Sequence, residues 1–527
     1  MKHTNGNYGD GQKATTSTKT SKDAEESISA TLEQNIEKVK QALGNSTDII
    51  IREIRIGKTG NIRAAIFYTD GLTGTKDLAD FVMKSLLMDT KGTELDDKIA
   101  FDEDLLNVLK ERAFTVAEIN EVMNFEAFYT SLLSGDAILL FEGQTQGFSV
   151  AIREWNQRSV TEPAAETIVR GPRESFTESI RTNTALIRRK IKDRNLWLET
   201  RMIGRVTKTD VSIMYIHGIV NDKVVEEVRR RLDQIDIDGI LESGYIEELI
   251  GDEPYSPFPT MYNTERPDVV AADLLEGRVA ILVDGTPFVL TAPTFFIQFF
   301  QASEDFYQPA IASSLLRMLR FLSFFIALIG SSLYIAVSTF HQEMLPTPLL
   351  ISLAAQREGV PFPAVIEALI METAFEILRE SSIRMPRAVG QAVSILGTLV
   401  IGTAAVDAGI VSAVMVIVIS ITAISNFIFP AANMSLSVRL IRFPMLLLAA
   451  SFGLFGIIIG FIALVLHLCS LRSFGVPYTS PLAPFILEDQ KDTIIRMPRF
   501  KLLTRPRLIS QKNITRERPS QGPKSRT

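Results

Sequence analysis

The chain has 527 residues, 46% of them hydrophobic and 22% charged, and a formal net charge of −6. This length predicts two or more structural units, and the mildly acidic balance argues against a protein that coats nucleic acid. The single cysteine, Cys469, excludes an intramolecular disulfide and a cysteine-based zinc site, and the four histidines are too far apart in sequence to suggest a metal cluster. We therefore expect no metal, no cofactor and no nucleic-acid partner.

Residues 1–44 predict a disordered polar lead-in. The opening stretch, MKHTNGNYGDGQKATTSTKTSK, has no apolar run of the length that a signal peptide needs. A segment of this composition has too little apolar surface to bury, so it is not expected to fold.

Residues 45–300 predict mixed α/β structure in two soluble subdomains, 45–160 and 161–300. In the first subdomain we expect a helix at 78–88 and two hairpins, at 48–56 with 61–68 and at 135–142 with 147–152. In the second we expect a strand at 211–220, a helix capped by Asn221 or Asp222 that runs to about Gln234, and a short helix at 268–276. Asp284 and Gly285 predict the turn of a hairpin between 279–283 and 288–291.

No catalytic motif accompanies these elements. The stretch IGKTG at 56–60 resembles the end of a phosphate-binding loop, but Arg52 stands where that motif needs its first glycine, so we interpret it as a hairpin turn. The sequence also lacks the GxSxG, HExxH and dinucleotide-binding glycine patterns. We therefore expect no enzyme and no catalytic residue.

The stretch RGPRESFTESIRTNTALIRRKIK at 170–192 is basic. A helix that starts just after Pro172 would place Glu174 and Glu178 near its positive end and residues 188–192 near its negative end, as the helix dipole favours. Its apolar stripe, which would pack on a core, consists of Phe176, Ile180, Ile187 and Ile191. The basic residues would then face outward. We expect Arg181, Arg188 and Arg189 to contact a neighbouring subunit, with the lipid surface and the other subdomain as alternatives.

Residues 301–470 predict an α-helical membrane domain with about four spanning helices, at 321–340, 388–406, 408–429 and 443–469. Arg317 and Arg320 precede the first span, and the tail at 471–527 is basic. Lysine and arginine stay preferentially on the cytoplasmic side, so both termini are expected there. The tail is expected to touch anionic lipid headgroups. Within the last span, Gly456 and Gly460 form a GxxxG pair, which is typical of tight helix packing or oligomerisation.

Residues 362–380, FPAVIEALIMETAFEILRE, are too charged for a simple fifth span. They predict a helix in the membrane interface, a re-entrant element or a helix that lines a polar cavity. In helical projection Glu372, Glu376, Arg379 and Glu380 share a polar face, whereas Glu367 falls on the apolar side.

A carboxylate at position 367 is costly unless it is paired, protonated or facing water. It would either pair with Arg379, Arg384 or Arg387, or line an ion path between subunits. Asn426, near a membrane boundary, would either touch permeant ions or make capping and interhelical bonds. The candidate residues for an ion path or polar membrane site are Glu367, Glu372, Glu376 and Asn426.

Three long strings of the sequence resemble a known family. They are EPAAETIVRGPRESFTESIRTNTALIRRKIK at 162–192, PTFFIQFFQASEDFYQP at 293–309, and MLPTPLLISLAAQREGVPFPAVIEALIMETAFEILRESSIRMPRAVGQAVSILG at 344–397. These strings look like hallmarks of the A subunits of GerA-type spore germination receptors. The similarity runs from about residue 45 to about residue 485.

The resemblance implies a cytoplasmic region of two α/β subdomains, similar to substrate-binding-protein scaffolds, followed by a multi-pass domain in the spore inner membrane. The partners that it implies are an integral-membrane B subunit, a lipoprotein C subunit and further copies of this chain. The implied function is a nutrient-gated cation channel that triggers germination. The alternative is a secondary transporter or permease of small nutrients or ions, because discontinuous helices and a buried carboxylate also suit transport. A third interpretation is a membrane scaffold that docks partners.

Overall fold

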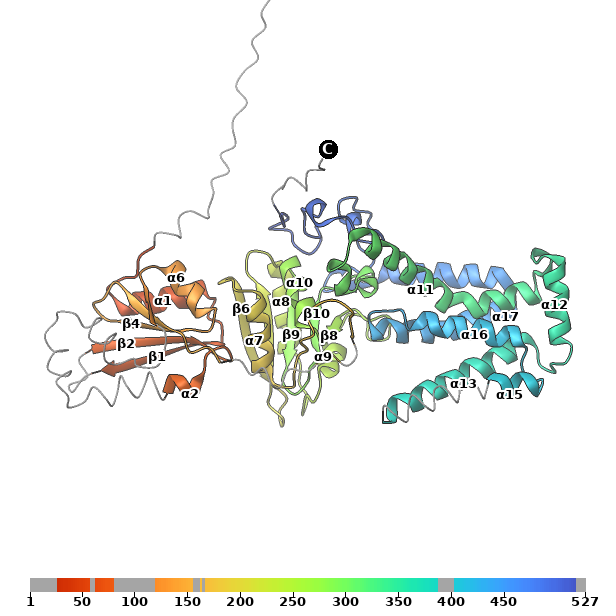
Figure 1. The fold of residues 1–527 in the computed structure, drawn as a ribbon, viewed down its shortest axis with the longest axis horizontal. Coiled ribbons are helices and arrows are strands. Elements are labelled where there is room, and N and C mark those ends of the chain that lie inside the picture. Colours follow the sequence, from red (N-terminus) through yellow and green to blue (C-terminus); the bar gives the residue numbers. More distant parts are fainter. Residues whose placement is uncertain are drawn as a thin grey trace, which may run out of the picture. The chain divides into compact units, whose positions relative to one another are not determined.

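The computed structural model describes residues 26–56, 62–79, 119–154, 162–163, 166–386 and 402–517. The chain divides into two compact units (Figure 1). The first comprises Met1–Asn156 with Ile191–Leu196, and the second comprises Gln157–Lys190 with Trp197–Thr527.

The first unit is built on a five-stranded antiparallel sheet in the order β1-β2-β4-β5-β3. Its strands are β1 (Ile49–Ile56), β2 (Ile62–Thr69), β3 (Ile119–Val122), β4 (Ala137–Phe141) and β5 (Gly147–Val150), and its described helices are α1 (Leu32–Ala42), α2 (Thr75–Asp77) and α6 (Phe125–Leu132). Successive side chains of a strand point to opposite faces. Ala65 and Phe67 of β2 therefore pack under α1 and α6, whereas Ala64 and Ile66 join the cluster on the other face. The expectation that residues 1–44 do not fold is wrong for α1, whose apolar side chains are buried in this core.

Both hairpins expected in this unit are confirmed. β1 pairs with β2, with Ile56 opposite Ile62 at the turn end, and β4 pairs with β5. The turn at 57–60 and most of the expected helix at 78–88 lie outside the described residues.

The α/β part of the second unit contains another five-stranded sheet, in the order β6-β7-β9-β10-β8. The strands are β6 (Leu196–Ile203), β7 (Thr209–Ile216), β8 (Tyr262–Thr264), β9 (Val279–Val283) and β10 (Val289–Ala292), and the helices are α7 (Ile180–Lys190), α8 (Asp222–Asp233), α9 (Ser243–Ile250) and α10 (Pro267–Glu276). α8 and α9 cover one face of the sheet, where Val228 and Ile246 pack against Ile213 and Ile281. α7 and α10 pack against each other and against β9.

Sequence signals place most of these elements correctly. The Oδ1 atom of Asn221 accepts a hydrogen bond from the backbone nitrogen of Lys223 at the start of α8, as expected of a cap. The hairpin of β9 and β10 is confirmed, and α10 begins one residue before the expected start. The expected strand at 211–220 ends at Ile216.

The basic helix is shorter than expected. α7 begins only at Ile180, so Glu174 and Glu178 precede it and do not occupy its first turn. The side chain of Asn183 explains the difference, because it bonds both the backbone nitrogen and the carbonyl oxygen of Thr177, at 2.7 and 2.6 Å. The first turn is held by Asp284 of the β9–β10 turn, whose Oδ1 accepts from the backbone nitrogen of Ile180 at 3.0 Å.

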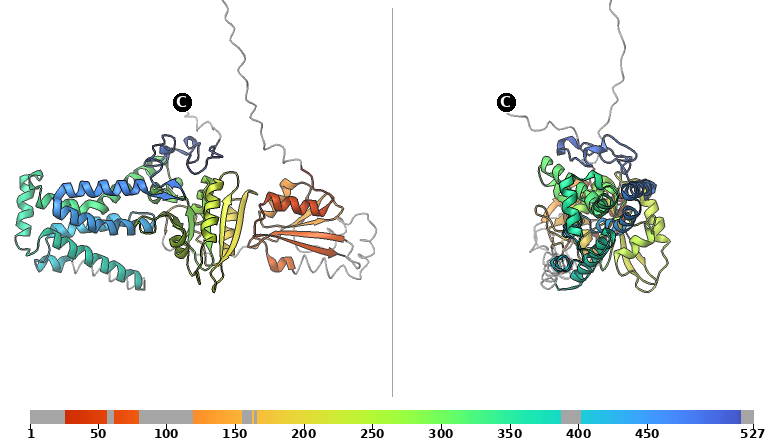
Figure 2. Two further views of the ribbon diagram at one scale, coloured as in Figure 1. Left: turned by 180° about the vertical axis from the view of Figure 1, so that it is seen from behind. Right: turned by 90° about the vertical axis from the view of Figure 1, so that its right-hand side faces the viewer.

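The helical part of the second unit follows two short 3-10 turns, η4 (Phe296–Phe300) and η5 (Ser303–Phe306). Its helices are α11 (Ala310–Thr339), α12 (Thr347–Arg357), α13 (Ala364–Arg384), α15 (Gly402–Asp407), α16 (Ala413–Asn426) and α17 (Ala432–Ser470). α11 packs along both α16 and α17 (Figure 2).

Two described segments, α11 and α17, are long and apolar enough to cross a membrane by length and composition, although α17 reaches its length only when it is counted across a break at Gly453. α16, within the expected span 408–429, is apolar but shorter. The expected span 388–406 lies largely outside the described residues. The count of four spanning helices is therefore not confirmed.

α17 folds back on itself and is not one straight rod. Its backbone breaks at Gly453, with φ 61° and ψ −139°, a conformation open essentially only to glycine. A Cβ atom on Gly460 would lie 2.5 Å from the Sδ atom of Met445, although a straight helix between these residues would be about 22 Å long. The segment expected as one span at 443–469 is thus two arms, 432–452 and 454–470, that pack together.

The GxxxG glycines lie at the contact between these two arms. A Cβ atom on Gly456 would come within 2.1 Å of the carbonyl oxygen of Leu448. The close approach expected from Gly456 and Gly460 is therefore present, and it is made within one chain.

Candidate functional site

The carboxylate of Glu367 on α13 is fully buried within the helical part of the chain. Its Oε2 atom accepts a hydrogen bond from the backbone nitrogen of Ser412 at 2.9 Å, at the start of α16. Its Oε1 atom lies 3.5 Å from Nε of Arg357, the last residue of α12. Glu367 therefore ties three helices together.

The expected partners of Glu367 make other contacts. Arg384 pairs with Glu380 at 2.6 Å, and the guanidinium of Arg379 lies 5.1 Å from the ring centre of Phe427. The third expected partner, Arg387, lies outside the described residues. The expected pairing with Arg379 or Arg384 is wrong, because Arg357 approaches from the neighbouring helix.

Glu372 and Glu376, one helical turn apart on α13, pair with two arginines on the first arm of α17. Nη1 of Arg442 lies 2.5 Å from Oε2 of Glu372, and both side chains are buried. The hydroxyl of Ser331 on α11 also donates to Glu372, at 3.2 Å. Arg439 pairs with Glu376 at 2.7 Å near the surface. Each carboxylate is compensated, as burial of charge in an apolar environment requires.

Asn426, at the end of α16, is buried. Neither its amide nitrogen nor its amide oxygen has a hydrogen-bond partner among the residues that the structure describes. The capping or interhelical bonds considered for it are not observed there.

A groove of about 710 Å³ opens beside the Glu376–Arg439 pair, between α13 and the first arm of α17. Its polar lining includes Glu376, Glu380, Arg384 and Arg439, and its apolar lining includes Ile377, Leu436, Leu440 and Phe443. Several of these apolar side chains are exposed in the single chain. The groove therefore offers a partly charged, partly apolar surface on the helical part.

The basic residues of α7 do not all face outward. Arg181 is exposed, but the side chain of Arg188 is fully buried. Arg189 and Lys190 both pair with Glu174, at 3.2 and 3.3 Å. The assignment of Arg188 to an outward subunit contact is thus wrong, because that side chain is not exposed.

Arg317 and Arg320, expected only as charges that flank a span, are buried around one carboxylate. Asp305 of η5 pairs with Nε of Arg317 at 2.8 Å and with Nη1 of Arg320 at 2.8 Å. Arg317 reaches further, to Asp492 of the C-terminal segment, also at 2.8 Å. The sequence reasoning missed this cluster, although Asp305 lies close before the two arginines in the chain.

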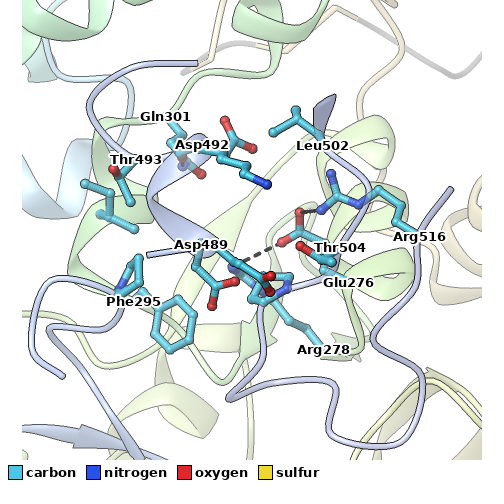
Figure 3. Close-up of a pocket in the computed structure, with 15 residues that line it drawn as sticks. Glu276, Arg278, Phe295, Gln301, Asp489, Asp492, Thr493, Leu502, Thr504 and Arg516 are labelled. Atoms are coloured by element: carbon cyan, nitrogen blue, oxygen red, sulfur yellow. Dashed lines mark hydrogen bonds and ion pairs between the residues drawn. The ribbon is translucent and has the colours of Figure 1, made fainter. Parts of the chain in front are cut away.

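The C-terminal segment, residues 471–517, packs on the α/β part of its own unit. Ile509 is buried with Phe295 and Ile297. Nε of Arg505 donates to the carbonyl oxygen of Leu275 at 2.7 Å. Arg516 pairs with Glu276 at 2.7 Å, beside a small hollow (Figure 3). The basic tail thus packs on its own chain over its described part, and its expected contact with anionic lipid headgroups stays a prediction.

In two carboxyl groups of the α/β part the pKa is raised to about 7. Burial raises the pKa of Glu166 to about 7, although the hydrogen bond that Thr264 donates to it lowers this pKa. Burial, reinforced by the charge of Glu242, also raises the pKa of Glu247 to about 7. Both groups can therefore change charge near neutral pH.

These features define a class of protein: an α/β region that leads into an apolar helical domain with internal arginine–carboxylate pairs and helices long enough to cross a membrane. Residues 37–508 match the family described as Bacillus/Clostridium GerA spore germination protein. Spore germination protein KA of Bacillus subtilis is 48% identical over 496 residues, which cover 94% of this chain and 90% of the relative. Spore germination protein GerLA of Bacillus cereus is 39% identical over 480 residues, which cover 91% of this chain and 96% of the relative.

Among solved structures, the N-terminal domain of the A subunit of the Bacillus megaterium spore germinant receptor GerK3 is 46% identical. That match covers 52% of this chain and 98% of the other, with a TM-score of 0.42. The chain belongs to the GerA spore germination protein family, as a relative of its A subunits. The family expected from the sequence is confirmed, and membership supports a role in spore germination.

Proposed function

We propose that this chain is the A subunit of a nutrient germinant receptor in the spore inner membrane, and that several copies form a nutrient-gated cation channel. Its partners in this proposal are an integral-membrane B subunit and a lipoprotein C subunit, and both of its termini are cytoplasmic. Its α/β region acts without catalysis. Family membership supports the receptor role, and the carboxylates of α13 support the channel.

The observation that carries the channel proposal is the presence of three carboxylates, Glu367, Glu372 and Glu376, on one helix of an apolar domain. Ionisable groups in such a domain are costly and typically mark a path for ions or substrates. Each of the three is paired with an arginine of the same chain. The ion path therefore runs between copies, along the groove beside Glu376, and not through a single chain.

The channel is tested with the assembled receptor in liposomes that are loaded with potassium. The expected result is nutrient-dependent cation efflux, reduced several-fold by Glu376→Gln with unchanged subunit assembly, because Glu376 lines the groove. Glu343→Gln, an exposed carboxylate of the turn after α11, is the matched control and should leave efflux unchanged. Normal efflux in Glu376→Gln and in Glu367→Gln would remove these carboxylates from the ion path.

The receptor role is tested separately in spores. Deletion of the gene should abolish potassium release and germination for at least one class of nutrient among amino acids, sugars and nucleosides. Spores that respond normally to every class would contradict the proposal for this chain.

A secondary transporter is the second candidate, favoured by the break in α17 at Gly453, because interrupted helices often build transport sites. Saturable solute uptake by liposomes that contain this chain alone would support the transporter. Nutrient-dependent current that requires the assembled receptor would support the channel.

A further inference from the structure

The C-terminal segment contains a small closed loop, residues 491–497, which we call the isoleucine loop. The backbone nitrogen of Met497 donates to the carbonyl oxygen of Lys491 at 2.9 Å, and an antiparallel bridge joins the residues next to these two. Two adjacent isoleucines, Ile494 and Ile495, lie in the tip of the loop, and they are 39% and 51% exposed. The loop therefore presents apolar side chains from a backbone that its own hydrogen bonds close.

The isoleucine loop is fixed to the start of α11 (Figure 1). The backbone nitrogen of Arg496 donates to the hydroxyl oxygen of Ser314 at 3.1 Å. The guanidinium of Arg317 donates to the carboxylate of Asp492 at 2.8 Å. Both ends of the loop thus lie against the first turns of the long apolar helix.

This attachment sets the depth of the loop in a membrane that α11 crosses. α11 has 30 residues and is about 45 Å long, whereas a hydrocarbon core is about 30 Å thick. The uncharged stretch at 321–340 matches such a core, and Ser314 and Arg317 precede it by about 6–10 Å along the helix axis. The headgroup layer on each side of the core is about 5–8 Å thick. The isoleucine loop therefore lies at the level of the lipid headgroups.

Exposed positive charges accompany the loop. The cations that are exposed and form no ion pair with a carboxylate of the described residues are Lys491, Arg499 and Lys501. The neighbouring carboxylates Asp492 and Glu488 are already paired with arginines of the chain. Exposed apolar side chains beside unpaired cations are typical of segments that lie in a membrane interface. A second copy of this chain would bring the same cations, whereas an anionic headgroup brings the opposite charge.

We propose that the isoleucine loop is an interfacial anchor. Ile494 and Ile495 enter the boundary of the membrane that holds α11, and the three exposed cations bind the headgroups of anionic lipids. The lipid contact expected of the whole basic tail is thereby narrowed to this loop and its cations, because Arg505 and Arg516 bond the α/β part instead. The inference rests on the membrane location in the proposed function, but it does not depend on channel activity.

Fluorescence quenching by spin-labelled lipids tests the anchor on the full chain in lipid nanodiscs. A thiol-reactive fluorophore is attached to Ile495→Cys in a Cys469→Ser background, which contains no other cysteine. A nitroxide on the lipid headgroup should quench this label strongly in discs that contain phosphatidylglycerol, and several-fold less in discs of phosphatidylcholine alone.

The dependence on anionic lipid comes from the three cations. Each cation near an anionic surface strengthens the contact about fivefold, so that the three together contribute on the order of 100-fold. Quenching in the anionic discs should therefore fall to the level of the neutral discs in a variant that combines Lys491→Gln, Arg499→Gln and Lys501→Gln. Equal quenching in both kinds of disc without these substitutions would overturn the binding of anionic headgroups.

Two further label positions separate the possible outcomes. Gln511→Cys is the matched control, because residue 511 is exposed on the same segment next to Lys512, which pairs with Asp222 of α8, and it should not be quenched. Leu333→Cys, exposed on α11, reports the membrane location itself. A nitroxide in the acyl chains should quench it in both kinds of disc.

A quenched label at position 333 together with an unquenched label at position 495 would overturn the anchor and leave the membrane location intact. A label at position 495 that aqueous iodide cannot reach and lipid nitroxide does not quench would assign the loop to a protein contact, which also overturns the anchor. An unquenched label at position 333 would remove the membrane location, and the anchor with it.

Discussion

Arg317 of α11 and Asp305 of η5 form an ion pair, with 2.8 Å between Nε and Oδ2, in which neither side chain is exposed to solvent. Arg317 also donates to the side chain of Asp492 and to the carbonyl oxygens of Asp492 and Thr493. One guanidinium thus joins the start of the long apolar helix to both the preceding loop and the C-terminal segment.

Arg317→Met is expected to destabilise the chain strongly. Asp305 keeps Arg320, and the carbonyl oxygen of Asp492 keeps Gln301, but the carboxylate of Asp492 and the carbonyl oxygen of Thr493 lose this donor in a buried site. Loss of one partner of a buried pair costs about 3–5 kcal/mol. Thermal unfolding in detergent should therefore show a clearly lower midpoint.

Arg384→Gln is the control for this change, because Arg384 pairs with Glu380 in an exposed i, i+4 pair that contributes little. If Arg317→Met and Arg384→Gln melted at the same temperature, the buried cluster would not stabilise the chain.

Much of the α/β fold could be predicted from local sequence signals. Asp284 and Gly285 mark a hairpin turn, Asn221 marks a helix start, and alternating apolar residues mark the strands. In each case neighbouring residues carry the information. The short start of α7 could not be predicted, because its first turn is held by Asp284, a residue far away in sequence.

In the candidate site, too, contacts between residues that are distant in sequence could not be predicted. The carboxylates Glu367 and Glu372 could be selected from the sequence, because charges in an apolar helix stand out. Their partners Arg357 and Arg442 could not, because helix packing decides which arginine approaches. The burial of Arg188 is likewise a tertiary effect. The apolar sequence continues on both sides of Gly453, so the reversal of α17 at this residue could not be predicted from the sequence pattern.

Arg505→Gln is expected to release the C-terminal segment from the α/β part. Its guanidinium donates to the carbonyl oxygen of Leu275 on α10 at 2.7 Å, and it also fixes the segment's own fold by donating to the carbonyl oxygens of Asn513 and Thr515. Loss of these charged hydrogen bonds costs about 3 kcal/mol, which raises the population of the released segment about 100-fold. Limited trypsin digestion should then cut after Lys512 and Arg516 much faster.

The control for the segment is Arg507→Gln, which removes a half-exposed pair with Glu488 and should digest at the rate of the unchanged chain. Equal digestion of Arg505→Gln and Arg507→Gln would show that the packed segment does not depend on Arg505.

The raised pKa of Glu166 predicts that the free energy of unfolding falls as the pH rises from about 4.5 to about 7. Burial raises its pKa to about 7 in the folded chain, so the folded state holds a proton that the unfolded state has already lost in this range. The free energy of unfolding should fall by up to about 1.4 kcal/mol per pH unit for such a group. Glu247, raised to the same value, adds to the slope.

Denaturant unfolding of the full chain at several pH values between 5 and 8 measures this slope, which Glu166→Gln should flatten because the amide does not titrate. Glu226→Gln on the exposed face of α8 should keep the original slope. A slope unaffected by Glu166→Gln would mean that Glu166 is not the titrating group.

The reversal of α17 predicts a specific cross-link. Met445 and Gly460 face each other across the two arms. Cysteines at both positions would therefore place two thiols next to each other, and the shorter side chain at position 445 leaves room for the new side chain at position 460. Cys469 is the only native cysteine, so Cys469→Ser provides a background without thiols. In that background Met445→Cys with Gly460→Cys should form an intramolecular disulfide on mild oxidation in the membrane.

Met445→Cys with Leu466→Cys is the control, because Leu466 is 65% exposed, and it should not cross-link. A straight helix would hold positions 445 and 460 about 22 Å apart and allow no bond, so failure of the first pair would refute the hairpin.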